Sequence, residues 1–293
     1  SLWISVPRQS LGTSQEISST VIAWIKLLKP RKVNSLGSAS DDKGMIKLSV
    51  LFSPAQIIML ATAPTYKITW EKLPDDFLLP SDPVDNINQP ALAAALTESL
   101  QVAGKLPETA LTSTNYGICA TINGKIVVKA PDWAYIPQIN VARSQVVRSY
   151  TPRLQGEIPA LVLEFLSDTD GGEYSVKETY PPGKFFYYEQ ILQLPNYGIF
   201  DLETGILELY RLGESRRYRL EPANEQGRFW IPEMQLFLGV WQGNRENRQG
   251  HWLRWWDEGG NLLLWGTEQI ERERQRAERL AAQLRAAGIE PEV

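Results

Sequence analysis

Cysteine and histidine are almost missing from this 293-residue sequence. Cys119 is the only cysteine, so the chain cannot form an internal disulfide, and nothing indicates an oxidising compartment. His251 is the only histidine, which excludes Ser-His-Asp and Cys-His catalysis as ordinary options and most zinc sites with them. We therefore expect a cytoplasmic protein whose chemistry uses carboxylates, lysine, tyrosine or serine.

Long apolar runs are missing as well. The most apolar stretch, residues 46–63, is interrupted by Lys47, Pro54 and Gln56, which argues against a membrane span. The first residues have neither the basic start nor the small-residue cleavage site of a signal peptide. Because no apolar run is long enough to span a membrane, we expect no membrane partner. Because 43% of the residues are apolar and 22% are charged, we expect a globular protein rather than a disordered one.

A surplus of positive charge is the third feature that the chain lacks. Its net charge is −4, whereas surfaces that follow nucleic-acid phosphates are usually basic, and this counts against nucleic-acid binding. The charge is uneven, because residues 1–58 contain seven basic and three acidic residues. This segment has no sustained hydrophobic period, and its Ser-, Gly- and Asp-rich stretch at residues 34–44 predicts a loop. We therefore expect residues 1–58 to be an N-terminal extension outside the core.

Residues 59–249 have the pattern of an α/β core. A helix is expected from Pro90 to Gly104, because leucines recur there every four residues. NYGICATI and KIVVKAPDWAYIP flank Asn123 and Gly124, the preferred residues of a tight type I′ hairpin turn. These elements predict that a helix and a hairpin precede the central strands.

The central strands follow from residue 160 onward. The segment ALVLEFL, residues 160–166, is apolar on both faces, as expected for a buried strand in the middle of a sheet. A helix over residues 184–194 and the strand NYGIFD come next, and this order predicts two parallel strands with a right-handed crossover. Further strand-like runs are ILELYRL, RYRLEP and FWIPEMQLFLGVW. The prediction is a mixed central sheet flanked by helices.

Two appendages follow the core. Residues 250–266 are rich in tryptophan and predict a hairpin around Gly259 and Gly260, and residues 267–293 predict a charged helix that Gly288 ends. A heptad frame on this helix has five apolar residues in six a and d positions, which are Ile270, Glu273, Ala277, Leu280, Leu284 and Ala287. Because the frame spans under three heptads, the helix alone is a weak dimerisation element. A solvated helix with Glu-Arg pairs is the competing interpretation.

Three polar residues in the core are candidates for a site. Glu164 lies inside the apolar strand, where a buried carboxylate requires a partner, a cation or a water-filled cleft. Asp132 could meet Glu164 across adjacent strands and form an oxygen cage for Mg²⁺ or Mn²⁺. Lys184 opens the predicted helix after a Pro-Pro-Gly sequence, where a phosphate would be attracted.

Each of these residues also has a plain structural interpretation. Glu164 could belong to a structural salt bridge or to an exposed edge. Asp132 could be a turn residue after Pro131, and Lys184 could be a solvated surface lysine. The residues alone leave these alternatives open.

Eight segments resemble, in order, the Uma-type restriction endonuclease family, which is abundant in cyanobacteria and belongs to the PD-(D/E)XK nuclease superfamily. They are ITWEKLPDDF, KAPDWAYIP, VLEFLSDTDGGEYSV, YPPGKFFYYEQIL, YGIFD, LFLGVW, HWLRWWDEGGNLLLW and ERQRAERLAAQLRAAGIEP, and the resemblance covers about residues 60–290. The resemblance implies a restriction-endonuclease-like α/β fold. It also implies a natural start at Met59, which is followed by LATAPTYKITWEKLPDDF.

The resemblance also assigns roles to the candidate residues. Asp132 matches the Asp of the PD half-motif and Glu164 the acid of the second half-motif, and both would hold Mg²⁺ or Mn²⁺. The superfamily usually has a lysine two residues after that acid, where this chain has Leu166. Lys184, with Tyr188 four residues on, matches the family's lysine on the following helix.

Other residues near these motifs have weaker assignments. Lys177 is the alternative lysine, and Asp168, Asp170 and Glu173 are candidate outer ligands, although a solvated acidic turn is the expectation for all three. On the first helix, Gln89 stands where family members often have a histidine. Glu98 is the only acid there, and we expect it on the solvated face.

The resemblance implies a metal-dependent endonuclease that hydrolyses phosphodiester bonds in DNA, with Lys184 orienting the water or stabilising the phosphate. Two other functions stay open: a non-catalytic module that uses the nuclease fold for binding or assembly, and a Mg²⁺-dependent phosphohydrolase of small compounds. Because nucleases that cut both strands commonly need two active sites, we expect a homodimer held by the core and the Trp-rich hairpin.

Overall fold

The computed structural model describes residues 38–40, 46–48, 66–78, 86–166 and 171–289. The chain divides into two compact units, Ser1–Thr65 and Tyr66–Val293. In the first unit, the described residues form two strands, β1 (Ser38–Ser40) and β2 (Ile46–Leu48), which pair antiparallel. The predicted start at Met59 and most of the predicted extension 1–58 lie outside the described residues.

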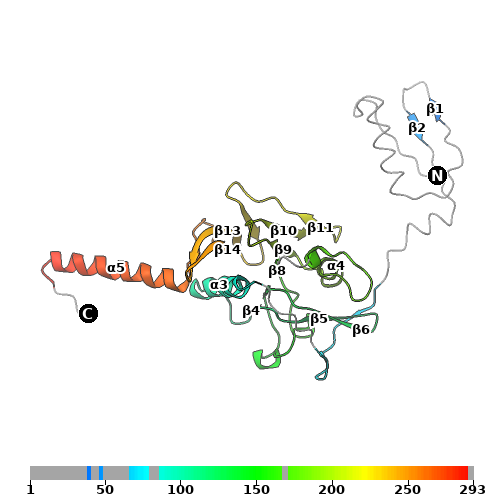
Figure 1. Ribbon diagram of the computed structural model, residues 1–293, viewed down its shortest axis with the longest axis horizontal. Coiled ribbons are helices and arrows are strands. Elements are labelled where there is room, and N and C mark those ends of the chain that lie inside the picture. The colour runs from blue at the N-terminus through cyan, green and yellow to red at the C-terminus, as the bar shows by residue number, and fades with distance from the viewer. Residues whose placement is uncertain (1–37, 41–45, 49–65, 79–85, 167–170, 290–293) are drawn as a thin grey trace. The chain divides into compact units, whose positions relative to one another are not determined.

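The second unit contains a six-stranded mixed sheet (Figure 1). Its order is β11 (Tyr218–Leu220), β10 (Leu207–Leu212), β9 (Asn196–Phe200), β8 (Leu161–Phe165), β7 (Trp133–Ile136) and β4 (Leu111–Ser113). The central pair β8 and β9 is parallel, and the other neighbours are antiparallel. Every residue of β8 and β9 is buried, which explains why β8 is apolar on both faces apart from Glu164. The predicted parallel pair and mixed sheet are thus confirmed.

Helices cover the two faces of this sheet. On one face, helix α3 (Asn88–Val102) buries its leucines against Leu161, Leu163 and Phe165 of β8. On the other face, Val162 packs with a short helix α4 (Lys184–Phe186) that continues as a π-helical turn, η4 (Tyr187–Leu192). Because side chains of a strand alternate between faces, Glu164 shares the α4 face with Val162. The alternation therefore directs the one acid of β8 toward Lys184.

A three-stranded sheet carries the predicted tight hairpin. Strands β3 (Ile68–Thr69), β5 (Ile118–Ile122) and β6 (Lys125–Lys129) form it. Asn123 and Gly124 have φ angles of +50° and +78°, as a type I′ turn requires. The long second strand predicted after this turn is divided in two, because β6 ends at Lys129 and β7 begins at Trp133 in the central sheet. Asp132 consequently precedes β7 instead of ending the hairpin.

The C-terminal strands pair differently from the prediction. Strands β12 (Arg228–Ile231), β13 (Leu236–Arg245) and β14 (Arg248–Trp256) form a meander, whose second turn contains Glu246 and Asn247 at positive φ. The turn at Gly259 and Gly260 is present, but it adds only a short bridge between Trp256 and Leu262. The main partner of β14 is therefore β13 and not the segment that follows it.

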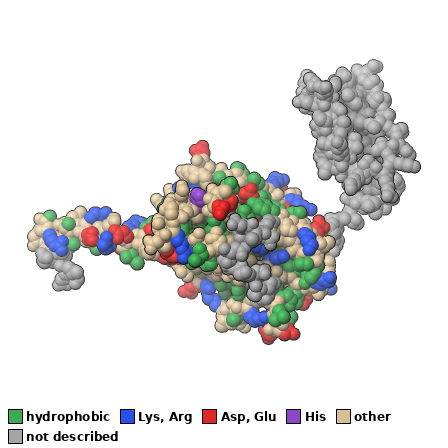
Figure 2. Space-filling view, viewed as in Figure 1, with side chains coloured by type: hydrophobic (Ala, Val, Ile, Leu, Met, Phe, Trp, Pro, Cys, Tyr) green, Lys and Arg blue, Asp and Glu red, His purple; other side chains and the backbone are tan. Residues whose placement is uncertain are grey.

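Helix α5 (Gly266–Ala286) leaves the end of this meander (Figure 1). Blue and red side chains alternate along it in Figure 2, and none of its residues is buried. Its base is anchored by Arg254, which is buried, lies 3.5 Å from the Trp265 ring centroid and pairs with Glu268 at 2.6 Å. Within the described residues, no helix has the length and apolar character needed to cross a membrane.

Two 3₁₀ turns complete the described elements, η2 (Arg143–Gln145) and η3 (Gly171–Tyr174). The second of them lies in the connection between β8 and α4. Its Glu173 is buried, and the hydroxyl of Tyr197 on β9 donates a hydrogen bond of 2.9 Å to the Glu173 backbone oxygen. This bond fixes the turn above the end of the central strands.

Candidate active site

Asp132 and Glu164 face each other across two neighbouring strands. Trp133 of β7 pairs with Leu163 of β8 in antiparallel register, so the next position outward places Asp132 opposite Glu164. Directly opposed residues of an antiparallel pair have Cβ atoms about 5 Å apart and point to the same face. The two carboxylates predicted from the sequence therefore lie side by side at the end of β8.

Glu164 is fully buried, and both of its carboxylate oxygens are hydrogen-bonded. The Lys184 ammonium lies 3.0 Å from Oε2, and the Tyr188 hydroxyl donates to Oε1 at 2.8 Å. Lys184 and Tyr188 come from the first turns of α4 and η4, which pack on that face of the sheet. The helix thus supplies both partners that a buried carboxylate requires.

Asp132 is fixed by backbone contacts of the neighbouring strand. The Phe165 backbone N–H donates to Asp132 Oδ2 at 2.6 Å. The side chain of Gln89, buried at the start of α3, donates to the Phe165 carbonyl oxygen at 2.9 Å. Gln89 therefore takes part in positioning the end of β8.

The electrostatics of the two carboxylates are strongly perturbed. Burial raises the pKa of Glu164 to about 8, and the charge of Asp132 adds to this rise while Lys184 and Tyr188 oppose it. Burial also raises the pKa of Asp132, against the Phe165 N–H and the charge of Lys184. The charge of Asp132 therefore disfavours ionisation of Glu164, whereas a hydrogen bond with Glu164 lowers the pKa of Asp132. A further cation between the two carboxylates would favour ionisation of both.

Lys184 remains protonated in this environment. Burial alone lowers its pKa, but the charges of Glu164 and Glu173 outweigh burial and raise the pKa above its ordinary value. A second lysine, Lys129, lies at the end of β6. Its pKa is lowered by burial and by the nearby charge of Lys184. The site therefore combines carboxylates with two lysines, one of which is held as a cation between acids.

Glu173 was expected on a solvated acidic turn, and this expectation was wrong. Glu173 is only 7% exposed, and its Oε1 lies 3.2 Å from the Lys184 Nζ. The Gly-Gly sequence before it and the tyrosine after it gave no sign of burial, because the burial depends on the long-range bond to Tyr197. Asp168 and Asp170 lie outside the described residues.

Lys177, the alternative lysine, and Leu166, at the position where a superfamily lysine was expected, have surroundings that differ from those of Lys184. Lys177 is exposed, and its backbone oxygen accepts a hydrogen bond from Gly183 at 2.9 Å. Leu166, which occupies the usual lysine position, is half-buried and packs against the apolar cluster beside η4. The lysine in contact with Glu164 is Lys184.

The donor atoms fit a magnesium-type ion that is bound mainly by water and substrate. Within the described part of the chain, no group of three or more His, Cys, Asp or Glu side chains is arranged to hold a metal ion. Mg²⁺ is commonly held by only one or two carboxylates, together with waters and phosphate oxygens. Asp132 and Glu164 supply this minimal set of hard oxygen ligands.

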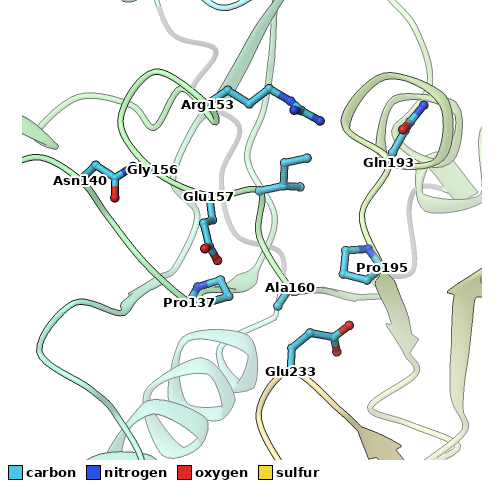
Figure 3. Close-up of a pocket in the computed structure, with 10 residues that line it drawn as sticks. Pro137, Asn140, Arg153, Gly156, Glu157, Ala160, Gln193, Pro195 and Glu233 are labelled. Carbon is cyan, nitrogen blue, oxygen red and sulfur yellow. The ribbon is translucent and has the colours of Figure 1, made fainter.

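A surface cavity of about 540 Å³ lies at the other end of the central strands (Figure 3). Ala160 and Pro195, which directly precede β8 and β9, line it together with Arg153, Glu157 and Glu233. Asp132 and Glu164 lie instead at the carboxyl end of β8, where ligands of parallel strands usually bind. The cavity is therefore separate from the candidate site.

The mixed sheet with its central parallel pair and its C-terminal strands and helix is a restriction-endonuclease-like α/β fold. The sequence profile of the Uma2 family, whose description is "Putative restriction endonuclease", matches residues 80–244, more than half of the chain. The chain belongs to this family, and the family implies a nuclease. No curated protein and no solved structure matches the sequence. The fold class and the family predicted from the sequence are thus confirmed.

Proposed function

We propose that this protein is a metal-dependent endonuclease that hydrolyses phosphodiester bonds in DNA. In this proposal Asp132 and Glu164 bind one or two Mg²⁺ or Mn²⁺ ions, and Lys184 acts on the phosphate or the attacking water. The observation that carries the proposal is the contact of Lys184 with Glu164 at 3.0 Å, in a register that sets Asp132 opposite Glu164. Membership of a family described as restriction endonucleases supports the choice of a nucleic-acid substrate.

The bound ion would polarise a phosphate oxygen and lower the pKa of a coordinated water. The protein side chains determine where this chemistry happens. Asp132 is oriented by the Phe165 N–H, and Glu164 by Tyr188, so both carboxylates present their remaining lone pairs in fixed directions. The rigid central strands therefore preorganise the oxygen ligands.

Lys184 acts as a cation in this proposal and not as a base. Its raised pKa keeps the ammonium protonated at neutral pH, so it has no free electron pair with which to accept a proton. Its N–H groups can donate to a phosphate oxygen or to the attacking water. A positive charge at this position would stabilise the negative charge that develops on the pentacoordinate phosphorus.

The net charge of −4 does not prevent phosphate binding at this position, because the local charges differ from the average. Lys129 and Lys184 both lie beside Glu164, and Lys177 is close enough to affect the pKa of Lys129. Charges that are partly buried are screened less by salt than exposed ones. The lysines at the end of β6 and at the start of α4 therefore place positive charges next to the carboxylates, where a phosphate could bind.

Metal binding and a substrate screen test the proposal together. We expect calorimetry to detect Mn²⁺ binding that Asp132→Asn weakens at least tenfold and that the exposed control Asp75→Asn leaves unchanged. We also expect nicking of supercoiled plasmid but no phosphate release from a small phosphomonoester. A protein that binds no Mn²⁺ would be a non-catalytic module, and one that acts only on the monoester would be a small-substrate phosphohydrolase.

A further inference from the structure

Glu173 is a third buried carboxylate next to the candidate site, and it comes from neither of the two strands. It lies on η3, and its Oε1 is 3.2 Å from the Lys184 Nζ. Its other oxygen, Oε2, is buried and has no hydrogen-bond partner among the described residues. A buried carboxylate oxygen without a donor costs free energy, so such an atom calls for a functional explanation.

Lys184 consequently lies between two carboxylates. Its ammonium is 3.0 Å from Glu164 Oε2 and 3.2 Å from Glu173 Oε1. The Lys184 side chain is 27% exposed and the Glu173 side chain is 10% exposed, so Glu173 is more enclosed than Lys184. An ammonium group has three N–H donors and can exchange one acceptor for another by a small movement.

A divalent cation on Asp132 and Glu164 would compete with Lys184 for the Glu164 oxygens. The two cations repel each other, and the repulsion is strong in a buried site because the effective dielectric constant is low. Without another anion, Lys184 would leave the site when the ion binds. Glu173 offers that anion, and its unpartnered Oε2 offers a second acceptor.

We propose that Glu173 is the positioning residue that retains Lys184 beside the substrate phosphate when the metal ion occupies Glu164. This inference rests on the proposed function. Glu173 acts through Lys184 and not as a metal ligand, because its carboxylate contacts the ammonium directly and forms no three-ligand group with Asp132 and Glu164 in the described part of the chain. The bond from Tyr197 to its backbone holds it there without using either carboxylate oxygen.

The lysine ammonium itself reports on this arrangement. In full-length protein with ¹⁵N-labelled lysine side chains, hydrogen-bonded ammonium groups that exchange slowly give ¹H–¹⁵N signals, and Lys184→Met identifies the signal of Lys184. In the wild type we expect this signal both without metal and at saturating Mg²⁺. In Glu173→Gln we expect it without metal, where Glu164 still holds the ammonium, and we expect its loss with Mg²⁺.

Two further variants make the result specific. Glu173→Asp keeps the charge and should retain the signal with Mg²⁺, whereas Glu178→Gln, an exposed glutamate in the same connection, should behave as wild type. The kcat of plasmid cleavage by Glu173→Gln should fall about 10- to 100-fold, since a misplacement of about 1 Å can cost that much, with KM unchanged. Calorimetric Mg²⁺ affinity, measured for each variant, shows whether it is saturated at the Mg²⁺ concentration used.

The possible results separate this inference from the proposed function. Persistence of the Lys184 signal in Glu173→Gln with Mg²⁺ would overturn the inference alone and leave Glu173 a structural residue. Loss of the signal in the wild type with Mg²⁺ would also overturn it, because Glu173 would then turn to the metal as a ligand. If the wild type bound neither Mg²⁺ nor Mn²⁺, both the inference and the proposed function would be refuted.

Discussion

Replacement of Glu164 by glutamine removes a charge from the fully buried centre of the site and keeps its shape. Burial raises the pKa of Glu164 from the ordinary 4.5 to about 8, so the folded protein favours the protonated form. The sign follows from this rise: the folded state is favoured most below pH 4.5, and this contribution is lost as the pH rises through 8. Glutamine does not titrate, so Glu164→Gln should remove this loss.

The size of the effect follows from the same values. One pKa unit corresponds to about 1.4 kcal/mol, so a rise from 4.5 to about 8 sets a ceiling of about 5 kcal/mol above pH 8. The variant also loses the ion pair with Lys184, which retains Glu173 as a partner, and this offsets part of the gain. We expect a net stabilisation of about 2 kcal/mol at pH 8.5, or about 4–8 °C in Tm for a domain of this size.

Thermal unfolding in the presence of a chelator at pH 5 and at pH 8.5 measures this effect. Glu164→Gln should match the wild type at pH 5 and melt higher at pH 8.5, while the exposed control Glu178→Gln should show neither change. Metal-dependent cleavage should be abolished. A Tm difference that is the same at both pH values would refute the electrostatic argument, and retained cleavage would remove Glu164 from the mechanism.

Three more predictions concern the surroundings of the site. Tyr188→Phe removes the 2.8 Å bond to Glu164 and should lower the unfolding free energy by about 2 kcal/mol at pH 8.5, and by less at pH 5, in urea titrations. Arg254→Lys loses the stack on Trp265 and the two bonds to Glu268, so it should cost about 3 kcal/mol while plasmid cleavage continues. In light scattering, we expect the full-length chain to have the mass of a homodimer and a chain truncated after Thr267 to keep that mass, whereas conversion to monomer on truncation would assign the interface to α5.

Local patterns were sufficient to predict much of the fold. The Asn123-Gly124 turn has a fixed backbone requirement, and the apolar run of β8 requires burial on both faces. Pairing between strands that are distant from any turn signal was harder to predict. Residues 125–137 were predicted as one strand, but the chain leaves the three-stranded sheet after Lys129 and joins the central sheet at Trp133. Strand β14 was assigned to the Gly259-Gly260 turn, although it pairs mainly with β13.

The candidate site likewise contains residues that the local sequence could identify and residues that it could not. Glu164 was identifiable because an acid inside an apolar strand is costly, and Lys184 because it begins a helix after Pro-Pro-Gly. Glu173 carries no such local signal, because its burial results from contacts with Tyr197 and Lys184. Glu98 was likewise expected in solvent, but it pairs with Arg245 at 2.7 Å and accepts the first N–H of α5. Long-range ion pairs of this kind are not encoded in any short window of sequence.

Plasmid cleavage tests the central claim most directly. Wild-type protein and Asp132→Ala are incubated with supercoiled plasmid in Mg²⁺ or Mn²⁺, with a chelator in a parallel sample, and nicked and linear products are separated on a gel. We predict metal-dependent conversion by the wild type and none by Asp132→Ala, provided that the variant keeps the thermal unfolding profile of a folded protein. Equal cleavage by both proteins, or no cleavage by a wild type that binds the metal, would contradict the assignment of this site as the catalytic centre of a DNA endonuclease.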